Sequence, residues 1–230
     1  MTIEPVAIFR SPFQTKFGIP RQAGVVADMP GRIVLEKPYR TADAIRGMED
    51  FDYLWLLWGF SANKHAASGV TVRPPRLGGN ASLGVFATRS PFRPNPVGLS
   101  SVRIDHIDYD SKDGPVIHVL GADLMDGTPI YDIKPYVPYT DAHPDARGGF
   151  TDNTQWQPLR VEIPEDVAVR FPADKLRILK TTLEQDPRPH YHADPQRVYG
   201  MPFDGEDIRF RVEDGTLYVV EVKSVPAKTK

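Results

Sequence analysis

The 230-residue chain contains no cysteine. This absence excludes disulfides, thiolate metal sites and a cysteine nucleophile, and it is compatible with a reducing compartment. The most apolar segment, Phe51–Phe60, is far shorter than the roughly 20 residues that a membrane-spanning helix needs. The N-terminal segment MTIEPVAIFRSPF also lacks the apolar core of a signal peptide. We therefore expect a cytoplasmic protein with no membrane contact.

Several common catalytic signatures are also missing. The sequence has no G-x-G-x-x-G fingerprint and no P-loop lysine motif, which argues against the usual dinucleotide and phosphate-binding loops. It has no G-x-S-x-G nucleophile elbow. His190 and His192 share a proline-rich segment with no third ligand nearby, and the other histidines show no spacing typical of a metal site. We expect no bound metal.

Acidic residues are missing from one long stretch of the chain. Between Tyr53 and Ile104 there is no Asp or Glu. The six cationic residues of this stretch are Lys64, Arg73, Arg76, Arg89, Arg93 and Arg103. Because the whole chain has a formal net charge of −2, the remainder carries −8. A local basic block suffices for contacts with nucleic-acid phosphates even in a slightly acidic protein, unless acidic residues from other segments neutralise it.

Glycine and proline, in contrast, are abundant, with 18 and 23 residues. Between the turns that they mark, short β-branched or alternating runs predict strands. The runs are Val6–Phe9, Arg32–Leu35, Leu54–Phe60, Gly84–Ala87, Leu99–Ile107, Val116–Leu120 and Ile130–Ile133. A short helix is predicted at Thr41–Met48, with Thr41 as its N-cap. Many short strands favour a closed or sandwiched β architecture over a doubly wound parallel sheet.

The composition predicts three consecutive parts. Residues 1–140 contain the predicted strands and form the β domain. Residues 141–157 are rich in polar turn formers without apolar periodicity, which is typical of a linker or excursion. Residues 158–230 form a small C-terminal α+β subdomain, with a helix at Pro172–Gln185 and a hairpin whose strands, Ile208–Val212 and Leu217–Val222, flank an Asp-Gly turn.

The segment Ala87–Ser100, ATRSPFRPNPVGLS, is the richest in chemical information. Its three prolines restrict the backbone, so that it does not continue as helix or central strand. It holds two guanidinium groups, Arg89 and Arg93, in set directions, which is typical of a docking site for an anionic or planar group. The alternative is a stiff surface loop whose arginines are solvated.

Two further segments share this character. The segment Ile19–Gln22, IPRQ, combines a fixed backbone with a guanidinium and an amide. The segment Asp126–Pro129, DGTP, is a tight turn that leads into a strand carrying Asp132 and Lys134. Such a turn either binds a ligand or closes a hairpin beside a surface ion pair. Taken alone, each of these segments is weak evidence for a functional site.

Taken in order, the segments IPRQ, RPPRLGGN, FATRSPFRPNPVGLS and DLMDGTPIYDIKPYVP closely resemble the TsaA/TrmO family. That family comprises tRNA methyltransferases that act on N6 of threonylcarbamoyladenosine at position 37, beside the anticodon. The resemblance covers roughly the first 140 residues and extends through QDPRP and the closing hairpin. It implies a small β-barrel methyltransferase domain of the non-Rossmann, class VIII type, S-adenosylmethionine as cofactor, the tRNA anticodon loop as partner, and a homodimer.

The resemblance also implies roles for individual residues. The implied cofactor-binding residues are Pro20, Arg21, Gln22, Ser61, Ala62, Arg89, Leu99, Asp126, Gly127, Thr128 and Pro129. Relatives often carry a histidine where Ser61 stands, so a contact through a ring would be lost there and a backbone contact retained. The chemistry itself requires a proton acceptor, for which Asp126 and Asp132 are the available carboxylates and water or the substrate the alternatives. Of these residues Asp132 is the catalytic candidate, together with Asn95. The candidates for tRNA contacts are Arg73, Arg76, Arg93 and Lys134.

Two other functions are open at the level of sequence. One is a methyltransferase of the same fold that acts on another RNA or on a small molecule. The other is a non-catalytic barrel that binds nucleic acid, which is disfavoured because such a protein has no use for a sulfonium cofactor site.

Overall fold

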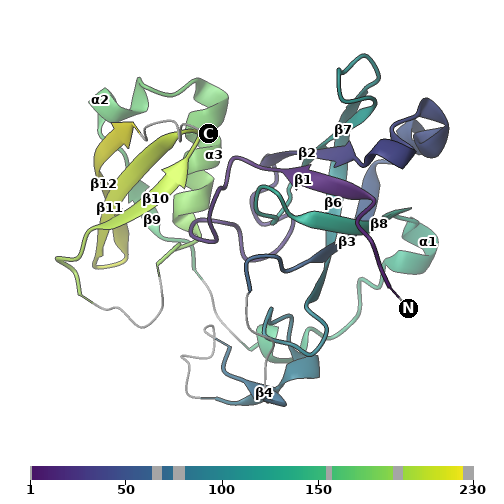
Figure 1. Cartoon of the computed structure of the whole chain (residues 1–230). Helices are drawn as coiled ribbons and strands as arrows, with labels where there is room; N and C mark the ends of the chain where they lie inside the picture. Colours follow the sequence, from purple (N-terminus) through teal and green to yellow (C-terminus); the bar gives the residue numbers. More distant parts are fainter. Residues whose placement is uncertain (1, 64–68, 75–80, 154–156, 189–193, 225–230) are drawn as a thin grey trace. The chain divides into compact units, whose positions relative to one another are not determined.

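The computed structural model describes residues 2–63, 69–74, 81–153, 157–188 and 194–224 (Figure 1). The chain forms two compact units, each assembled from segments that are far apart in the sequence. Unit 1 comprises Met1–Ile8, Ile33–Val119 and Thr128–Gln157. Unit 2 comprises Phe9–Arg32, Leu120–Gly127 and Pro158–Lys230. Among the described residues, no helix is long and apolar enough to cross a membrane.

Six strands pair in the order β1-β2-β7-β6-β3-β8, and β8 also pairs with β1 (Figure 1). The strands are β1 (Ala7–Arg10), β2 (Pro30–Leu35), β3 (Tyr53–Gly59), β6 (Val97–Asp108), β7 (Val116–Leu120) and β8 (Pro129–Pro135). β3 pairs antiparallel with both β6 and β8. Each of these strands overlaps a predicted one, and the mainly β architecture is confirmed.

Burial alternates along β3, so that one face of this strand is buried. Leu54, Leu56 and Trp58 are buried, with at most 7% of any side chain exposed. Trp55 and Leu57 point to the opposite face, because successive strand residues alternate. One face of β3 therefore contributes to the core, and the other is available for polar neighbours and ligands.

Two local predictions in unit 1 are wrong. The predicted strand Gly84–Ala87 is a two-residue strand, β5 (Leu83–Gly84), followed by the 3-10 turn η5 (Val85–Ala87). β5 pairs antiparallel with β4 (Thr71–Val72). The predicted helix at Thr41–Met48 is interrupted because Gly47 adopts a left-handed φ of 82°. In its place are the 3-10 turns η2 (Ala42–Ile45) and η3 (Met48–Asp50). The remaining short elements of this unit are η1 (Lys37–Tyr39), α1 (Pro138–Asp141) and η6 (Gly149–Thr151).

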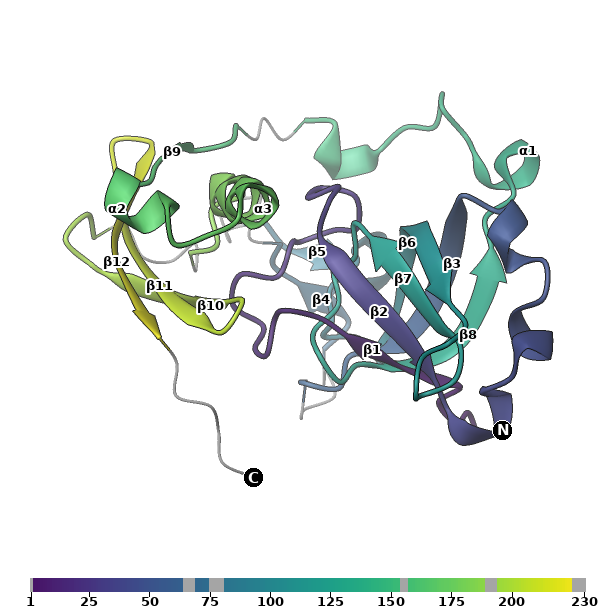
Figure 2. The same ribbon diagram turned by 90° about the horizontal axis from the view of Figure 1, so that it is seen from above.

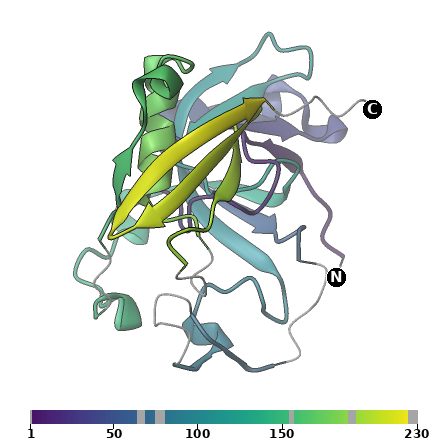
Figure 3. The same cartoon turned by 90° about the vertical axis from the view of Figure 1, so that its left-hand side faces the viewer.

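Unit 2 contains a four-stranded sheet with the order β10-β11-β12-β9. Its elements are β9 (Arg160–Glu162), α2 (Glu165–Ala168), α3 (Ala173–Glu184), β10 (Tyr199–Phe203), β11 (Glu206–Glu213) and β12 (Thr216–Ser224). β9 pairs parallel with β12, and the other neighbours are antiparallel. The predicted helix and hairpin are confirmed, whereas β9 and β10 were not predicted. Figure 3 shows the sheet from one face, with α3 behind it.

The core of unit 2 lies between α3 and the sheet (Figure 2). α3 contributes Leu179 and Leu183, and the sheet contributes Phe210 and Leu217, all fully buried. The same core includes three residues from Ser11–Met29, the segment between β1 and β2. These are Phe13, Val26 and Met29, each at most 2% exposed. We call this segment the arm. An N-terminal segment is thus part of the same hydrophobic core as the C-terminal sheet.

Candidate active site

The proline-rich loop Thr88–Pro96 is held by its own side chains. The Thr88 hydroxyl donates to the Val85 carbonyl at 2.9 Å and accepts from the Ser90 N–H at 3.3 Å. The Ser90 hydroxyl accepts from the Phe92 N–H at 3.2 Å. The half-buried Arg93 donates from Nη1 to the Thr88 carbonyl at 3.1 Å. Together with the prolines, these bonds fix the loop, and Arg93 is itself one of its supports.

The end of this loop lies beside the end of β3. The Phe60 N–H donates to the Pro96 carbonyl at 2.9 Å, and the Val97 N–H donates to the carbonyl of the exposed Asn95 at 2.7 Å. Because Ser61 and Ala62 directly follow Phe60, the structure brings these predicted residues next to the loop. Ser61 is exposed and Ala62 is half-buried.

The register of β6, β3 and β8 brings Leu99 and Asp132 onto one face. Leu57 of β3 pairs with Leu99 of β6 and with Asp132 of β8. Directly paired residues of neighbouring strands point to the same side, so the three side chains form a row. With neighbouring strands about 4.8 Å apart, the row spans about 10 Å. Leu99 is 54% exposed and offers an apolar surface on the same face as the Asp132 carboxylate, with Leu57 between them.

Asp132 and Lys134 form an ion pair on this face. The Lys134 Nζ lies 2.9 Å from Asp132 Oδ2, and the two side chains are 63% and 46% exposed, respectively. The other carboxylate oxygen, Oδ1, accepts from the Ile133 N–H at 3.0 Å. Lys134 pairs in register with Trp55, one row away from Leu57. The predicted catalytic and tRNA-binding residues of β8 therefore act as a coupled pair of charges.

The Asp126 turn is built on the start of the arm. The Asp126 N–H donates to the Phe13 carbonyl at 2.8 Å, and Asp126 Oδ1 accepts from the Ser11 N–H at 3.1 Å. Asp126 Oδ2 lies 3.6 Å from Arg10 Nη1. Gly127 adopts a left-handed φ of 76°, which a side chain would disfavour. The turn is thus tied to unit 2, whereas Thr128, 2% exposed, and Pro129 fall within unit 1.

The predicted segment Pro20–Gln22 lies in the middle of the arm. Pro20 is buried, and Arg21 and Gln22 are half-buried. Arg21 Nη2 donates to the carbonyl of Asp186 at 3.0 Å, and Gln22 Nε2 donates to the Arg21 carbonyl at 2.7 Å. This segment is therefore held by the part of the chain that follows α3.

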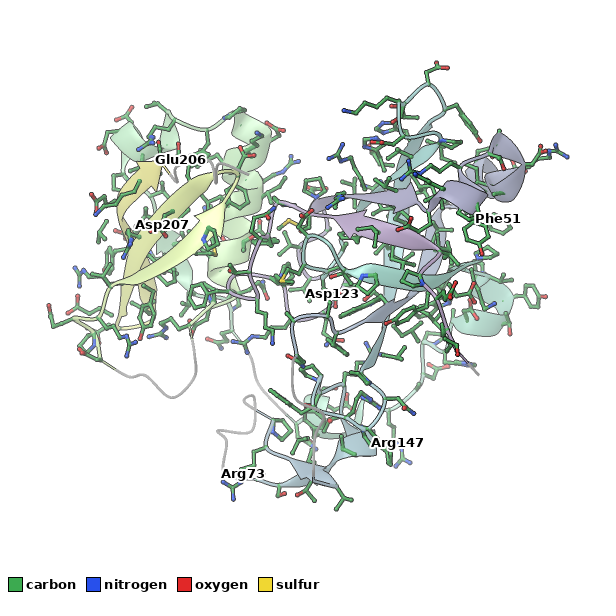
Figure 4. All side chains as sticks on the ribbon, in the orientation of Figure 1. Phe51, Arg73, Asp123, Arg147, Glu206 and Asp207 are labelled. Carbon is green, nitrogen blue, oxygen red and sulfur yellow. The ribbon has the colours of Figure 1, made fainter. Side chains whose placement is uncertain are left out.

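The predicted site residues thus fall into two sets. Unit 2 carries Pro20, Arg21, Gln22, Asp126 and Gly127. Unit 1 carries Ser61, Ala62, Arg73, Arg89, Arg93, Asn95, Leu99, Thr128, Pro129, Asp132 and Lys134. Arg73 follows β4 and is exposed (Figure 4), and Arg89 is exposed in the proline-rich loop. Arg76 lies outside the described residues.

Sequence reasoning missed the neighbours that support these residues. Trp55 and Leu57 lie between the predicted residues of β6 and β8, and the uniformly apolar run Leu54–Phe60 gave no signal for their face. Arg10 and Asp186 gave no signal either, because their contacts join segments that are distant in the sequence. In the described part of the chain, no group of three metal-ligating side chains comes together.

Comparisons with known proteins match both parts of the chain. The profile described as the tRNA-methyltransferase O N-terminal domain matches residues 8–142, and that of the TrmO C-terminal domain matches residues 157–225. The tRNA (adenine(37)-N6)-methyltransferase of Escherichia coli K12 is 39% identical over 220 residues, covering 92% of this chain and 93% of its own. The enzyme of the same name from Eikenella corrodens is 43% identical over 176 residues, covering 76% and 98%.

Solved structures agree with these sequence matches. A crystal structure of TrmO from Pseudomonas aeruginosa superposes with a TM-score of 0.77 at 31% sequence identity. The superposition covers 97% of this chain and 98% of that one. The similarity thus extends over the first sheet and the C-terminal sheet alike.

Proposed function

The chain belongs to the TrmO family, and from this membership we infer that it is an S-adenosylmethionine-dependent tRNA (adenine(37)-N6)-methyltransferase. The observation that carries this inference is the end-to-end similarity to enzymes of that name, over both domain profiles. We further propose that the substrate adenosine carries the threonylcarbamoyl group. In the first sheet, the last strand of the order, β8, pairs with the first, β1. This closure supports a small β-barrel of the non-Rossmann, class VIII type.

The residues of the two sets fit the cofactor chemically. S-adenosylmethionine presents a carboxylate, an ammonium group, a cationic sulfur and an adenine ring. The guanidinium groups of Arg21 and Arg89 suit the carboxylate, the Asp126 carboxylate suits a cation, and the exposed Leu99 suits the ring. We propose that all eleven cofactor residues named from the sequence contribute, with Ser61 and Ala62 acting through their backbone.

The bound cofactor supplies an activated methyl group, so the protein has to align the nucleophile and manage a proton. Alignment of a displacement contributes strongly to rate, and proton transfer by a positioned group adds to it. We propose that Asp132, on the same face as Leu99, lies near the reacting nitrogen and accepts or stabilises its proton. We propose that Asn95 contacts the edge of the substrate base. Arg93 and Lys134 are proposed to bind a phosphate or the threonine carboxylate.

Arg73, Arg76 and Arg93 are proposed to contact the tRNA backbone around the anticodon loop. Exposed apolar side chains of unit 1 favour the predicted homodimer, because a partner would remove them from water. They include Val70, Phe86, Phe92, Val97 and Leu99. We propose that residues 1–140 form the methyltransferase domain, with 141–157 as a linker and 158–230 as the C-terminal subdomain, and that the enzyme acts in the cytoplasm, where its substrate is.

Mass spectrometry of tRNA nucleosides tests the function directly. The purified protein, with S-adenosylmethionine, should add one methyl group to threonylcarbamoyladenosine in tRNA. Transfer to another nucleoside or to a small molecule would favour the same-fold alternative. Cofactor-induced thermal stabilisation without any transfer would favour a non-catalytic role.

The residue roles require a separate experiment. Cofactor binding and turnover are measured separately for three variants, Asp132→Ala, Arg93→Ala and Asn95→Ala. We expect Asp132→Ala to lose turnover while binding the cofactor. Full activity in all three variants would refute these assignments but not the methyltransferase function.

A further inference from the structure

The arm takes its conformation from the C-terminal part of the chain. Phe13 and Met29, near its two ends, are buried in the core of unit 2. Gly18 has a φ of +88°, and a Cβ placed on it would lie 2.5 Å from the sulfur of Met201 in β10. Phe17 stacks with Phe210 of β11, with ring centroids 6.5 Å apart. The backbone that carries Pro20–Gln22 is therefore packed against β10 and β11.

Asp186 and Arg188 form a clamp just beyond α3. Asp186 Oδ1 and Oδ2 accept from Arg188 Nε at 2.8 Å and Nη2 at 2.9 Å. Asp186 Oδ1 also accepts from the Arg188 N–H at 3.3 Å. The two side chains are only 19% and 20% exposed. The hydrogen bonds that the Arg188 side chain donates to Asp186, more than the charge of Asp186, raise the pKa of Arg188 above its usual value. A two-point bond between a planar guanidinium and a carboxylate fixes orientation as well as distance.

The clamp holds the Asp186 backbone in an uncommon conformation. Asp186 has a φ of +50°, in the left-handed region that non-glycine residues rarely occupy. The carbonyl of this residue accepts the 3.0 Å hydrogen bond from Arg21 Nη2. Since the donors of a guanidinium lie in one rigid plane, a bond to one of them constrains the direction of the whole group.

We propose that Asp186 and Arg188 are positioning residues for the methyl donor. They hold the Asp186 carbonyl against Arg21 and thereby preset the Pro20–Gln22 segment. The C-terminal subdomain is then a structural part of the cofactor site, in addition to anything it contributes to RNA binding. This inference rests on the proposed function, in which Pro20–Gln22 binds S-adenosylmethionine.

The test uses the full-length protein and a matched control. Asp186→Gly keeps the left-handed backbone but removes the carboxylate, and Arg188→Lys removes the planar donor. Asp204→Gly is the control, because Asp204 also has a φ of 50° and pairs with a cation, Lys175 at 2.5 Å, but it lies in the β10–β11 turn. We expect both clamp variants to raise the KM for S-adenosylmethionine about tenfold, the effect of losing one charge-assisted hydrogen bond. The kcat at saturating cofactor and tRNA should change less than about twofold, because the reacting groups are untouched.

Two comparisons separate the clamp from the assigned site. Suppose that Arg21→Ala weakens cofactor binding, whereas Asp186→Gly and Arg188→Lys bind the cofactor like the unmodified protein. The positioning role of Asp186 and Arg188 is then refuted, and the assignment of Pro20–Gln22 to the cofactor is retained. If Arg21→Ala itself binds normally, the assignment of Pro20–Gln22 to the cofactor fails. The double variant Arg21→Ala/Asp186→Gly should bind no more weakly than Arg21→Ala alone, since both act through one bond. An additive loss, or an equal loss in Asp204→Gly, would mean general destabilisation and overturn the proposal.

Discussion

Gly98 lies where the proline-rich loop enters β6, and its missing side chain makes room for an indole ring. Gly98 pairs in register with Trp58 of β3. A Cβ on Gly98 would lie 2.5 Å from Cζ2 and 2.7 Å from Cδ2 of Trp58. The ring is held in place, since Trp58 Nε1 donates to the buried Ser100 hydroxyl at 2.9 Å and the ring packs edge-on against Phe60 at 4.4 Å. We therefore predict that Gly98→Ala displaces Trp58.

The magnitude follows from three effects. Overpacking a filled interior costs about 1–3 kcal/mol. If the indole moves away from Ser100, a buried N–H loses its acceptor, which costs about 1–3 kcal/mol more. Alanine also restricts the unfolded chain, which raises the free energy of unfolding by only about 0.4–1 kcal/mol. We expect the free energy of unfolding of unit 1 to fall by about 2–4 kcal/mol.

Denaturant unfolding followed by tryptophan fluorescence measures this change. The signal reports on unit 1, because the residue ranges of unit 2 contain no tryptophan. Gly84→Ala is the control: its φ of −58° is ordinary, and an added Cβ meets no atom within 4 Å. It should leave stability unchanged or raise it by up to about 1 kcal/mol. An unfolding midpoint for Gly98→Ala at or above that of the unmodified protein would refute this packing argument.

Two further predictions concern charge. The pKa of Asp141 is lowered by hydrogen bonds from the Val137 N–H and, second, from the Trp55 indole. A carboxyl whose pKa is depressed by folding stabilises the fold above its ordinary value of 3.8 and loses this contribution as the pH falls through the folded pKa. Asp141→Asn should therefore be less stable than the unmodified protein near pH 7, and denaturant unfolding should show this difference narrowing as the pH falls below 3.8. For tRNA binding measured across salt concentrations, Arg73→Ala should reduce the slope of log K against log salt by about 0.7, the loss of one single-strand phosphate contact. Arg177→Ala, which removes an arginine already paired with an acid at 3.0 Å, should leave the slope unchanged, and equal slopes in all three proteins would contradict the assignment of Arg73.

The sequence was sufficient for features that depend on local patterns. The short apolar run Leu54–Phe60 predicts β3, and the Asp214-Gly215 turn predicts the β11–β12 hairpin, because both signals lie within a few residues. β9 and β10 were missed because Arg160–Glu162 is too short for a periodic signal and because Gly200 and Pro202 interrupt β10.

The arrangement of the candidate site was less accessible. Leu99 and Asp132 meet on one face only through the register of β6, β3 and β8, which no local pattern determines. The arm presents the same difficulty. Phe13 and Met29 are apolar residues in a segment without regular structure, and nothing nearby in the sequence identifies the core of unit 2 as their partner. The hydrogen bond from Arg21 to Asp186 likewise joins residues 165 positions apart.

The acid-free stretch could have been neutralised by acids from elsewhere in the fold. Within the described residues, neither Arg73 nor Arg103 makes an ion pair, and Arg93 donates to a carbonyl. Asp132, which pairs in register with Leu57 of this stretch, forms an ion pair with Lys134 of its own strand. The carboxylate that β8 contributes near this stretch is thus already paired with a cation of the same strand. Since phosphate contacts depend on local and not total charge, a net charge of −2 is compatible with the proposed contact between Arg73 and tRNA.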